Sequence, residues 1–110
     1  MNTYSLENVK ARELFPGFVG KFVHAENMTF VYWEIAAGSP LPAHSHPHEQ
    51  VINMFEGQFE ISITGGETRL LGPGDVYVIP GGAEHSGRAL TRCSILDVFH
   101  PVREEYVWED

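Results

Sequence analysis

The apolar side chains of this chain recur mostly at every second position, in short runs that glycine and proline interrupt. This period of two, with almost no helical period, is typical of β-strands. The runs that we expect to form strands are residues 28–35, 59–64, 68–71, 76–79 and 92–99. Only residues 6–15 resemble a short helical turn, which Pro16 and Gly17 would end. The pattern predicts an all-β protein.

Clusters of glycine and proline separate these runs and indicate tight turns. Gly65 and Gly66 form the kind of pair that supplies positive φ in a β-hairpin, and residues 72–75 and 80–82 are two further turn segments. Short strands at near-regular spacing are typical of sandwiches, jelly rolls and barrels. We therefore expect one of these two-layered β-architectures.

Length and composition narrow the class further. The chain has 110 residues, 7 Lys and Arg against 15 Asp and Glu, and a formal net charge of −8. This length suits a single domain, residues 1–110, and the negative charge argues against nucleic acid or an anionic membrane as a partner. The single cysteine, Cys93, cannot form an intramolecular disulfide, and the N-terminal segment has no apolar signal region. We expect a soluble cytoplasmic protein.

Four of the six histidines lie in or near two glycine-bounded segments, residues 38–57 and 74–89. Alternate positions of the first segment carry His44, His46, His48 and Gln50. Alternate side chains of an extended segment share one face, so these four can point together into a barrel. The second segment delivers His85 after a Pro-Gly-Gly turn. Imidazole nitrogen with a carboxamide or carboxylate oxygen suits Zn, Ni, Fe, Cu or Mn, which predicts a divalent first-row transition metal.

The first of these segments resembles the first motif of the cupin family. That motif is Gly, five residues, His-x-His, three or four residues, Glu, six residues and Gly. The residues that stand at these spacings are Gly38, His44, His46, Gln50 and Gly57. Gln50 therefore replaces the usual Glu.

The second segment resembles the second cupin motif, which is Gly, five residues, Pro-x-Gly, two residues, His, three residues and Asn. The matching residues are Gly74, Pro80, Gly82 and His85, with Ala89 where the family has Asn. Together the two motifs imply a double-stranded β-helix, or jelly-roll, barrel. The ligand set that they imply for one divalent metal ion is His44, His46, Gln50 and His85.

The replacement of Glu by Gln50 changes the expected chemistry of this site. Three neutral imidazoles and a neutral amide leave the double charge of the ion uncompensated. Such an ion is a stronger Lewis acid and lowers the pKa of a bound water or substrate hydroxyl more effectively. Ala89 lies outside the implied ligand set, so it does not affect this chemistry.

The tail, residues 97–106, resembles the closing segment of the small pectin-degradation cupins of the KdgF type. In those proteins an Asp-x-Phe-x3-Arg run after the last strand lines the active site, and a glutamine joins three histidines on the metal. Asp97, Phe99, Arg103 and Gln50 match this pattern. The resemblance implies conversion of 4,5-unsaturated monouronates from pectin or alginate to their linear keto form.

The residues alone leave two alternatives open in the tail. Asp97 either points inward with the apolar side chains of its strand, where opposing effects would bring its pKa near neutrality, or faces solvent at the strand end. Arg103 either binds a substrate carboxylate or pairs with Glu104 or Glu105 at the surface. The first alternative of each pair makes the tail part of an active site.

Other chemistry-bearing positions receive plainer interpretations. Strand parity does not separate His48 from His46, although the spacing from Gly38 favours His44 and His46 as ligands. His24 and His100 belong to no motif and are interpreted as ordinary polar positions. The remaining such residues are interpreted as core, with one aromatic ring lining the cavity: Cys93, Phe30, Tyr32 and Trp33.

Three functions are compatible with these residues. In a metal-dependent isomerase of a carboxylated sugar, the metal polarises a hydroxyl or the ring oxygen, Asp97 moves the proton, Arg103 anchors the carboxylate and Phe99 packs on the ring. The same ligands suit a non-haem Fe(II) dioxygenase. A non-enzymatic module that binds a small anion or sugar is the third. We favour the isomerase and, because a jelly roll has open strand edges, a homodimer.

Overall fold

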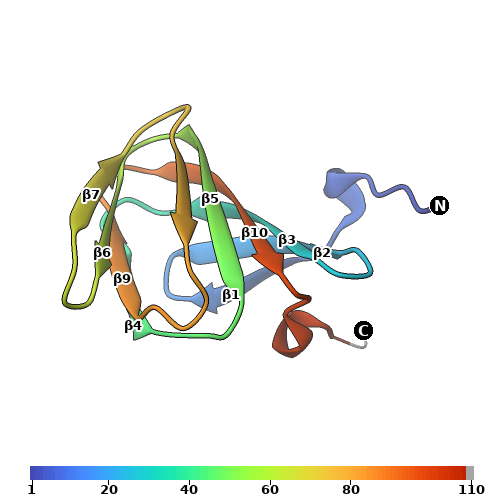
Figure 1. The fold of residues 1–110 in the computed structure, drawn as a ribbon. Helices are drawn as coiled ribbons and strands as arrows, with labels where there is room; N and C mark the ends of the chain where they lie inside the picture. Colours follow the sequence, from blue (N-terminus) through green and yellow to red (C-terminus); the bar gives the residue numbers. More distant parts are fainter. Residues whose placement is uncertain (109–110) are drawn as a thin grey trace.

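The computed structural model describes residues 1–108, which are mostly β-strand (Figure 1). The strands are β1 (Ala11–Phe15), β2 (Phe18–His24), β3 (Thr29–Ile35), β4 (Pro40–His44), β5 (Glu49–Glu56), β6 (Phe59–Ile63), β7 (Thr68–Leu71), β8 (Val76–Ile79), β9 (His85–Ala89) and β10 (Cys93–His100). Two 3-10 helices flank them, η1 (Leu6–Asn8) and η2 (Glu104–Tyr106). Within the described residues, neither helix is long or apolar enough to cross a membrane.

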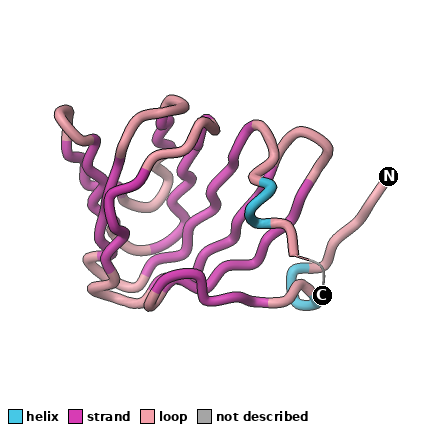
Figure 2. Tube along the Cα trace, turned by 90° about the horizontal axis from the view of Figure 1, so that it is seen from below, coloured by secondary structure: helices cyan, strands magenta, loops and turns pink. Residues whose placement is uncertain are grey.

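The strands form two antiparallel sheets that enclose one interior (Figures 1 and 2). The larger sheet has the order β1-β2-β3-β10-β5-β8, and the smaller sheet has the order β4-β9-β6-β7. From β4 onward the chain crosses repeatedly from one sheet to the other, as in a jelly roll. The predicted jelly-roll barrel is confirmed.

Strand β10 lies in the middle of the larger sheet and pairs with β3 on one side and β5 on the other. Its inward side chains are Cys93, Ile95, Asp97 and Phe99, all buried. The Cys93 thiol is fully enclosed, and burial raises its pKa, which agrees with a core role. One carboxyl, that of Asp97, therefore shares the apolar interior.

The core combines the inward side chains of both sheets. Trp33 and Ile35 of β3 pack in one cluster with Phe59 and Ile61 of β6. Gly87 of β9 leaves room for the Phe59 ring, because any Cβ there would overlap it. Burial of these apolar side chains is the main term that stabilises the two-sheet arrangement.

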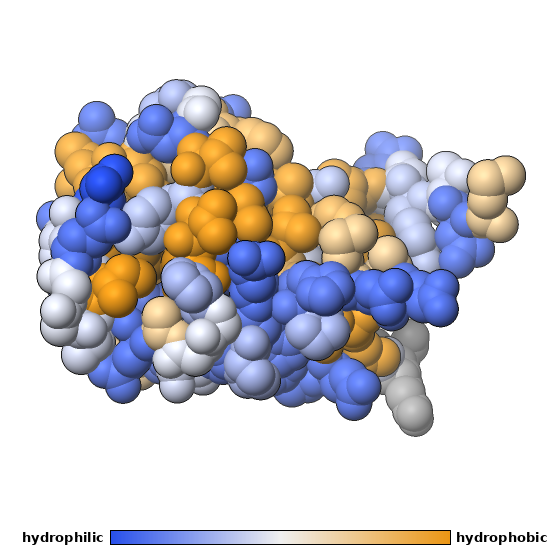
Figure 3. Space-filling view, in the orientation of Figure 1, coloured by the Kyte–Doolittle hydropathy of each residue, from blue (hydrophilic) through white to orange (hydrophobic). Residues whose placement is uncertain are grey.

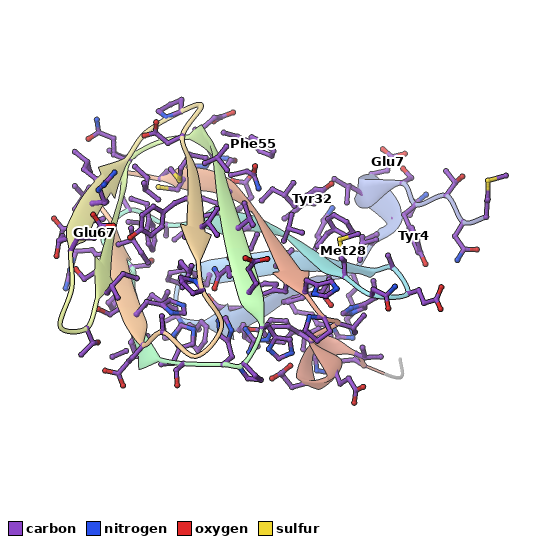
Figure 4. The ribbon with its side chains drawn as sticks, in the orientation of Figure 1. Tyr4, Glu7, Met28, Tyr32, Phe55 and Glu67 are labelled. Atoms are coloured by element: carbon purple, nitrogen blue, oxygen red, sulfur yellow. The ribbon has the colours of Figure 1, made fainter. Side chains whose placement is uncertain are left out.

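The outer face of the larger sheet also carries apolar side chains (Figure 3). Phe55, Val76 and Val78 are each more than half exposed. The larger sheet thus presents apolar surface on both of its faces. The N-terminal segment, which carries Tyr4, lies far from Glu67 at the opposite end of the molecule (Figure 4).

All five predicted strands are present in the structure. Residues 68–71 and 76–79 form strands with the predicted bounds, and the other three predicted strands shift by one residue at one or both ends. The helical turn expected over residues 6–15 is wrong beyond Asn8, because residues 11–15 pair with β2 as a strand.

Strands β2, β4, β5 and β9 have no counterpart among the predicted strand runs. Of these, β2 and β9 contain a glycine that interrupts the alternation of side chains. Gly20 of β2 lies against the Trp33 ring, where a Cβ would come within 2.8 Å of a ring carbon. Gly87 of β9 lies equally close to Phe59. The packing of large rings in the core therefore explains why the sequence pattern of these two strands is incomplete.

Candidate metal centre and its cavity

Three histidines meet where β4 ends and β9 begins. His44 is the last residue of β4 and is the cross-strand partner of His85, the first residue of β9, while His46 lies in the loop that leads to β5. The ring centroids are 4.4 Å apart for His44 and His85, 5.2 Å for His46 and His85, and 5.6 Å for His44 and His46. One ring nitrogen from each lies within 4.8 Å of the others, so the three could hold a metal ion.

Two loops bring these histidines together, and backbone contacts join the loops. The Gly82 N–H donates a hydrogen bond to the His46 carbonyl at 2.8 Å. Gly81 packs so closely on the Pro47 carbonyl that a Cβ would overlap it. The glycines of the Pro-Gly-Gly turn allow the two loop backbones to come into contact. This contact places His85 beside His46.

Each of the three imidazoles is oriented by a backbone carbonyl two residues away. Nδ1 of each ring forms a 2.9–3.0 Å hydrogen bond with the carbonyl of Pro42 for His44, of His48 for His46, and of Ala83 for His85. A carbonyl only accepts, so Nδ1 carries the ring proton and Nε2 of the neutral ring keeps its lone pair. Metal-ligating histidines have this arrangement.

The protonation of the site also suits a metal. Burial, helped by the positive charge of Arg103, lowers the pKa of His46 to about 4, and burial lowers the pKa of His85. Both rings are thus neutral at pH 7, as ligands must be. His85 Nε2 is fully buried and has no hydrogen-bond partner among the described residues. Such an orphan atom is costly, and an ion beside it would satisfy it, so the residues fit a divalent metal.

Gln50, the fourth predicted ligand, is buried near the start of β5 and lies beside the histidines. Its Oε1 is 3.1 Å from His46 Nε2. Because His46 Nδ1 holds the ring proton, both of these atoms offer lone pairs, and a shared cation would stabilise such a pair. Gln50 remains a predicted ligand in a suitable position.

The prediction that one extended segment carries His44 to Gln50 on a single face is wrong. The chain leaves β4 after His44 and enters β5 at Glu49, so alternation does not run through the loop between them. His48 is buried, its ring centroid lies 5.6 Å from that of His46, and it is not one of the three histidines whose nitrogens converge. The structure therefore separates His48 from His46.

The carboxyl of Asp97 is held inside the barrel by Trp33. The indole Nε1–H donates a hydrogen bond to Asp97 Oδ2 at 3.0 Å, whereas Oδ1 is buried with no hydrogen-bond partner among the described residues. Burial raises the pKa of Asp97 to about 7, against the opposing effects of Gln50, Trp33 and Arg103. A carboxyl of this kind can hold or release a proton near neutral pH.

Arg103 is buried as well, so neither of the alternatives left open by the sequence describes it fully. Its guanidinium lies over two rings, with Cζ 4.2 Å from the centroid of Tyr106 and 4.9 Å from that of Phe99. Its Nε and Nη2 donate hydrogen bonds to Glu105 at 3.3 Å each. The Arg103 side chain is only 8% exposed and that of Glu105 is 52% exposed, so the pair extends from the interior to the surface.

One cavity connects these groups. The predicted site residues among its lining are His44, Gln50, Asp97, Phe99 and Arg103. The rest of its wall is mainly aromatic and aliphatic. A largely apolar cavity with a few converging polar groups is typical of small-molecule sites. Among residues 1–108 the cavity thus brings together two candidate ligands, a carboxyl with a pKa of about 7 and a guanidinium.

The tail half of this cavity is the part lined by Asp97, Phe99, Arg103 and Tyr106. Sequence reasoning missed the residues that hold it in place. The Arg103 N–H donates to Thr29 Oγ1 at 2.9 Å, and His24 contacts both Thr29 Oγ1, at 2.8 Å, and the Tyr106 carbonyl, at 3.0 Å. His24 was predicted to be an ordinary polar position. The only available signal was that Thr29 shares strand parity with Trp33 and therefore faces inward.

The fold and the site together define the class of protein as a small jelly-roll barrel with three histidines that could hold a metal ion. A model of the cupin domain family matches residues 31–99, more than half of the chain. The chain belongs to the cupin family.

Solved structures resemble this barrel along nearly all of its length. KdgF from Halomonas sp. superposes with a TM-score of 0.88 at 27% sequence identity, over 96% of this chain and 100% of that chain. An RmlC-like cupin from Shewanella frigidimarina gives a TM-score of 0.88 at 24% identity, over 97% of each chain. The second likeness supports the fold alone, and together they identify a small cupin that resembles KdgF.

A curated relative matches a shorter stretch. Dimethylsulfoniopropionate lyase DddQ from Ruegeria pomeroyi is 38% identical over 56 residues, which cover 51% of this chain and 28% of the lyase. The matched stretch is thus just over a quarter of that relative's length.

Proposed function

We propose that this cupin is a metal-dependent isomerase that converts 4,5-unsaturated monouronates, or related sugar acids, to their linear keto form. The observation that carries the proposal is a cavity lined by two of the uncharged candidate ligands, His44 and Gln50, by a buried carboxyl with a pKa of about 7, and by a buried arginine. The likeness to KdgF over nearly the full length of both chains supports the same assignment.

The metal would be held by three imidazoles and one amide. The residues concerned are His44, His46, His85 and Gln50. When bound, a divalent ion such as Zn, Ni, Fe or Mn supplies a Lewis acid that polarises a hydroxyl or the ring oxygen of the sugar. Because this ligand set carries no charge, it does not weaken that polarisation.

The remaining work falls to the tail half of the cavity. Arg103 binds the uronate carboxylate, and Phe99 packs against the sugar ring. The reaction removes the proton of the C1 hydroxyl, opens the bond between C1 and the ring oxygen, and adds a proton at C4 as C5 becomes a ketone. Asp97 moves this proton at Oδ1, since Oδ2 is occupied by the Trp33 N–H. The proton balance closes without an oxidant.

An absorbance assay tests this proposal. The metal content of the purified protein is measured, 4,5-unsaturated galacturonate is added, and the loss of its conjugated absorbance is followed with and without a chelator. We expect chelator-sensitive loss of absorbance. Asp97→Asn should retain the metal but slow turnover about 100-fold or more, and Arg103→Ala should raise KM.

Matched controls replace exposed residues of the same kind, Glu26→Gln and Arg69→Ala, which should behave like the wild type. Wild-type rates in metal-loaded Asp97→Asn and Arg103→Ala would refute the proposed roles. Oxygen uptake with Fe(II), and none with Zn or Ni, would instead identify a dioxygenase. Bound metal without turnover of any kind would favour a binding module.

A second candidate is elimination from a small carboxylate, which the 38% identity with the dimethylsulfoniopropionate lyase favours. The same groups would serve, with Arg103 on the carboxylate and Asp97 removing the proton next to it. The assay is therefore repeated with dimethylsulfoniopropionate, and release of dimethyl sulfide is measured. Release at a higher kcat/KM than that for the uronate would replace the isomerase with the lyase.

The homodimer stays a prediction. The edge strands are β1 and β8 in the larger sheet and β4 and β7 in the smaller sheet. Unpaired strand edges favour pairing with another chain, and the exposed Val76 and Val78 lie on one of them. Sedimentation velocity at micromolar concentration should give the mass of a dimer, and a monomer would contradict the prediction.

A further inference from the structure

We infer that Glu105 is a positioning residue that holds the Arg103 guanidinium in the orientation that binds a substrate carboxylate. This inference rests on the proposed function, in which Arg103 is the carboxylate anchor. Glu105 itself is on η2, is about half exposed and does not line the cavity. It therefore acts on the substrate only through Arg103.

The hydrogen bonds between these two residues use one edge of the guanidinium. Glu105 Oε1 accepts from Nε and Oε2 accepts from Nη2, each at 3.3 Å, in the two-pronged arrangement that planar guanidinium and carboxylate groups form. The described residues supply no hydrogen-bond partner to Nη1. One edge of Arg103 is thus fixed by Glu105, and the edge with Nη1 remains for a ligand in the cavity that Arg103 lines.

The other contacts of Arg103 leave Glu105 as the group that sets this orientation. The Tyr106 and Phe99 rings lie against the guanidinium, and Thr29 fixes the backbone nitrogen. Ring contacts restrict the plane of a guanidinium but do not select which edge faces inward, because the attraction depends on its position over the ring. A directional hydrogen-bond partner is needed for that, and among the described residues Glu105 is the one that supplies it to the side chain.

A second carboxyl makes this selection necessary. Asp97 lines the same cavity as Arg103, yet no ion pair joins them among residues 1–108, and the pair that Arg103 does form is with Glu105. If Arg103 turned toward Asp97, the two side chains would form an ion pair, and neither the carboxylate anchor nor the proton-transferring group would be available to the substrate. Glu105 keeps them apart by offering a carboxylate outside the cavity.

The opposite role for Glu105 would be competition, in which its carboxylate occupies the N–H groups that the substrate needs. The two roles make opposite predictions for the Michaelis constant. Removal of a positioning residue raises KM, whereas removal of a competitor lowers it. Since both leave the proton-transferring group in place, kcat changes little in either case.

The test uses the metal-loaded full chain and compares Glu105→Ala and Glu105→Gln with Glu104→Gln. Glu104 is exposed, precedes Glu105 in η2 and has no ion pair with Arg103, so its substitution is the matched charge control. With 4,5-unsaturated galacturonate we expect Glu105→Ala to raise KM roughly three- to tenfold, with kcat within about twofold of wild type. Glu105→Gln should lie between, and Glu104→Gln should match the wild type.

A binding measurement separates positioning from a general structural effect. Titration calorimetry with galacturonate should show the same loss of affinity in Glu105→Ala, while galactose, which lacks the carboxylate, should bind the variant and the wild type equally. In an Arg103→Ala background, Glu105→Ala should have no further effect, because Glu105 acts through that side chain. An equal loss for galactose, or additive effects in the double variant, would overturn the inference.

These outcomes distinguish failure of the inference from failure of the proposed function. A wild type that turns over the uronate, with KM unchanged or lowered in Glu105→Ala, overturns the inference alone. A wild type that binds galacturonate in an Arg103- and Glu105-dependent way without turnover overturns the isomerase and supports the inference. A wild type that neither binds nor turns over the uronates overturns both.

Discussion

The candidate site has two halves that different kinds of contact hold in place. The histidine half consists of His44, His46 and His85, and the tail half is the part of the cavity wall around Arg103. In the histidine half, backbone groups do most of the positioning: three carbonyls orient the three rings, and a bond from the Gly82 N–H joins the loops. In the tail half, side chains do the positioning: Thr29 and His24 form hydrogen bonds, and two aromatic rings pack against Arg103. The two parts of the candidate site therefore depend on different kinds of contact, backbone bonds in one and side-chain contacts in the other.

The difference has a clear consequence for robustness. Backbone contacts in the histidine half survive substitution of most neighbouring side chains, except where a glycine permits the contact. Each contact in the tail half is lost when a single hydroxyl, imidazole or carboxylate is removed. We expect substitutions in the two halves to have separable effects, and the predictions below follow from the largest effect to the smallest.

The largest effect is expected in the histidine half, from His85→Ala. This change removes the fully buried ligand candidate and leaves a gap beside His44 and His46. Two remaining imidazoles bind a divalent ion weakly, so metal affinity should fall at least about 100-fold and activity with it. Metal analysis after dialysis measures this. The control is His100→Ala, which removes an exposed histidine, and metal retention by His85→Ala would contradict the centre.

A smaller effect should follow from Trp33→Phe, which keeps an aromatic ring but removes the N–H that fixes Asp97 Oδ2. A hydrogen bond to a charged group is worth about 1.5–3 kcal/mol. We therefore expect kcat to fall about tenfold or more, with metal content and KM unchanged. Steady-state kinetics with the unsaturated uronate measures this, and a rise in KM with kcat unchanged would show that Trp33 contributes to binding instead.

In the tail half, Thr29→Val replaces a hydroxyl that both accepts from the Arg103 N–H and contacts His24. Thr29 is fully buried, so these partners lose a bond without gaining water. The cost should be about 1–3 kcal/mol, which lowers Tm by several degrees. Thr29→Ser keeps the hydroxyl and is the control. Metal affinity should remain, and its loss in Thr29→Val would mean that the two halves are not separable.

An effect on melting temperature similar in size to that of Thr29→Val is expected from pH in the metal-free chain. The pKa of Asp97 is raised by burial from 3.8 to about 7, so between these values the folded state keeps a proton that the unfolded chain has released. Stability from this group therefore falls as pH rises from about 4 to 7 and stays low above 7. Asp97→Asn should melt several degrees higher than the wild type at pH 8, and at a similar temperature at pH 4. Parallel melting curves over this range would refute the raised pKa.

The sequence was a good guide to the fold and to the histidine half of the site for a physical reason. Period-two alternation marked five of the strands, and His44, His46 and His85 lie in or directly beside two short loops whose geometry depends on glycine and proline. Two of the strands that it missed, β2 and β9, contain Gly20 and Gly87, which lie against rings packed from other strands. Local pattern therefore sufficed where local geometry decides.

The tail half could not be predicted in the same way. The Trp33 bond to Asp97 joins residues 64 positions apart, and the Arg103 bond to Thr29 spans 74. Such contacts depend on the register between β3 and β10, which alternation alone does not fix. The parity of Asp97 indicated an inward direction, but the partner that holds its carboxyl required the assembled sheet.

The central place of β10 also sets how the cavity can open. Amide hydrogens of this strand bond to β3 and β5 on both sides, so they exchange with solvent only when the larger sheet opens. The tail beyond it has few backbone bonds, among them Tyr106 N–H to the Arg103 carbonyl and Val107 N–H to the Glu104 carbonyl. Its amides should exchange far sooner than those of β10. The wall that carries Arg103 should therefore open to solvent more readily than the strand that carries Asp97.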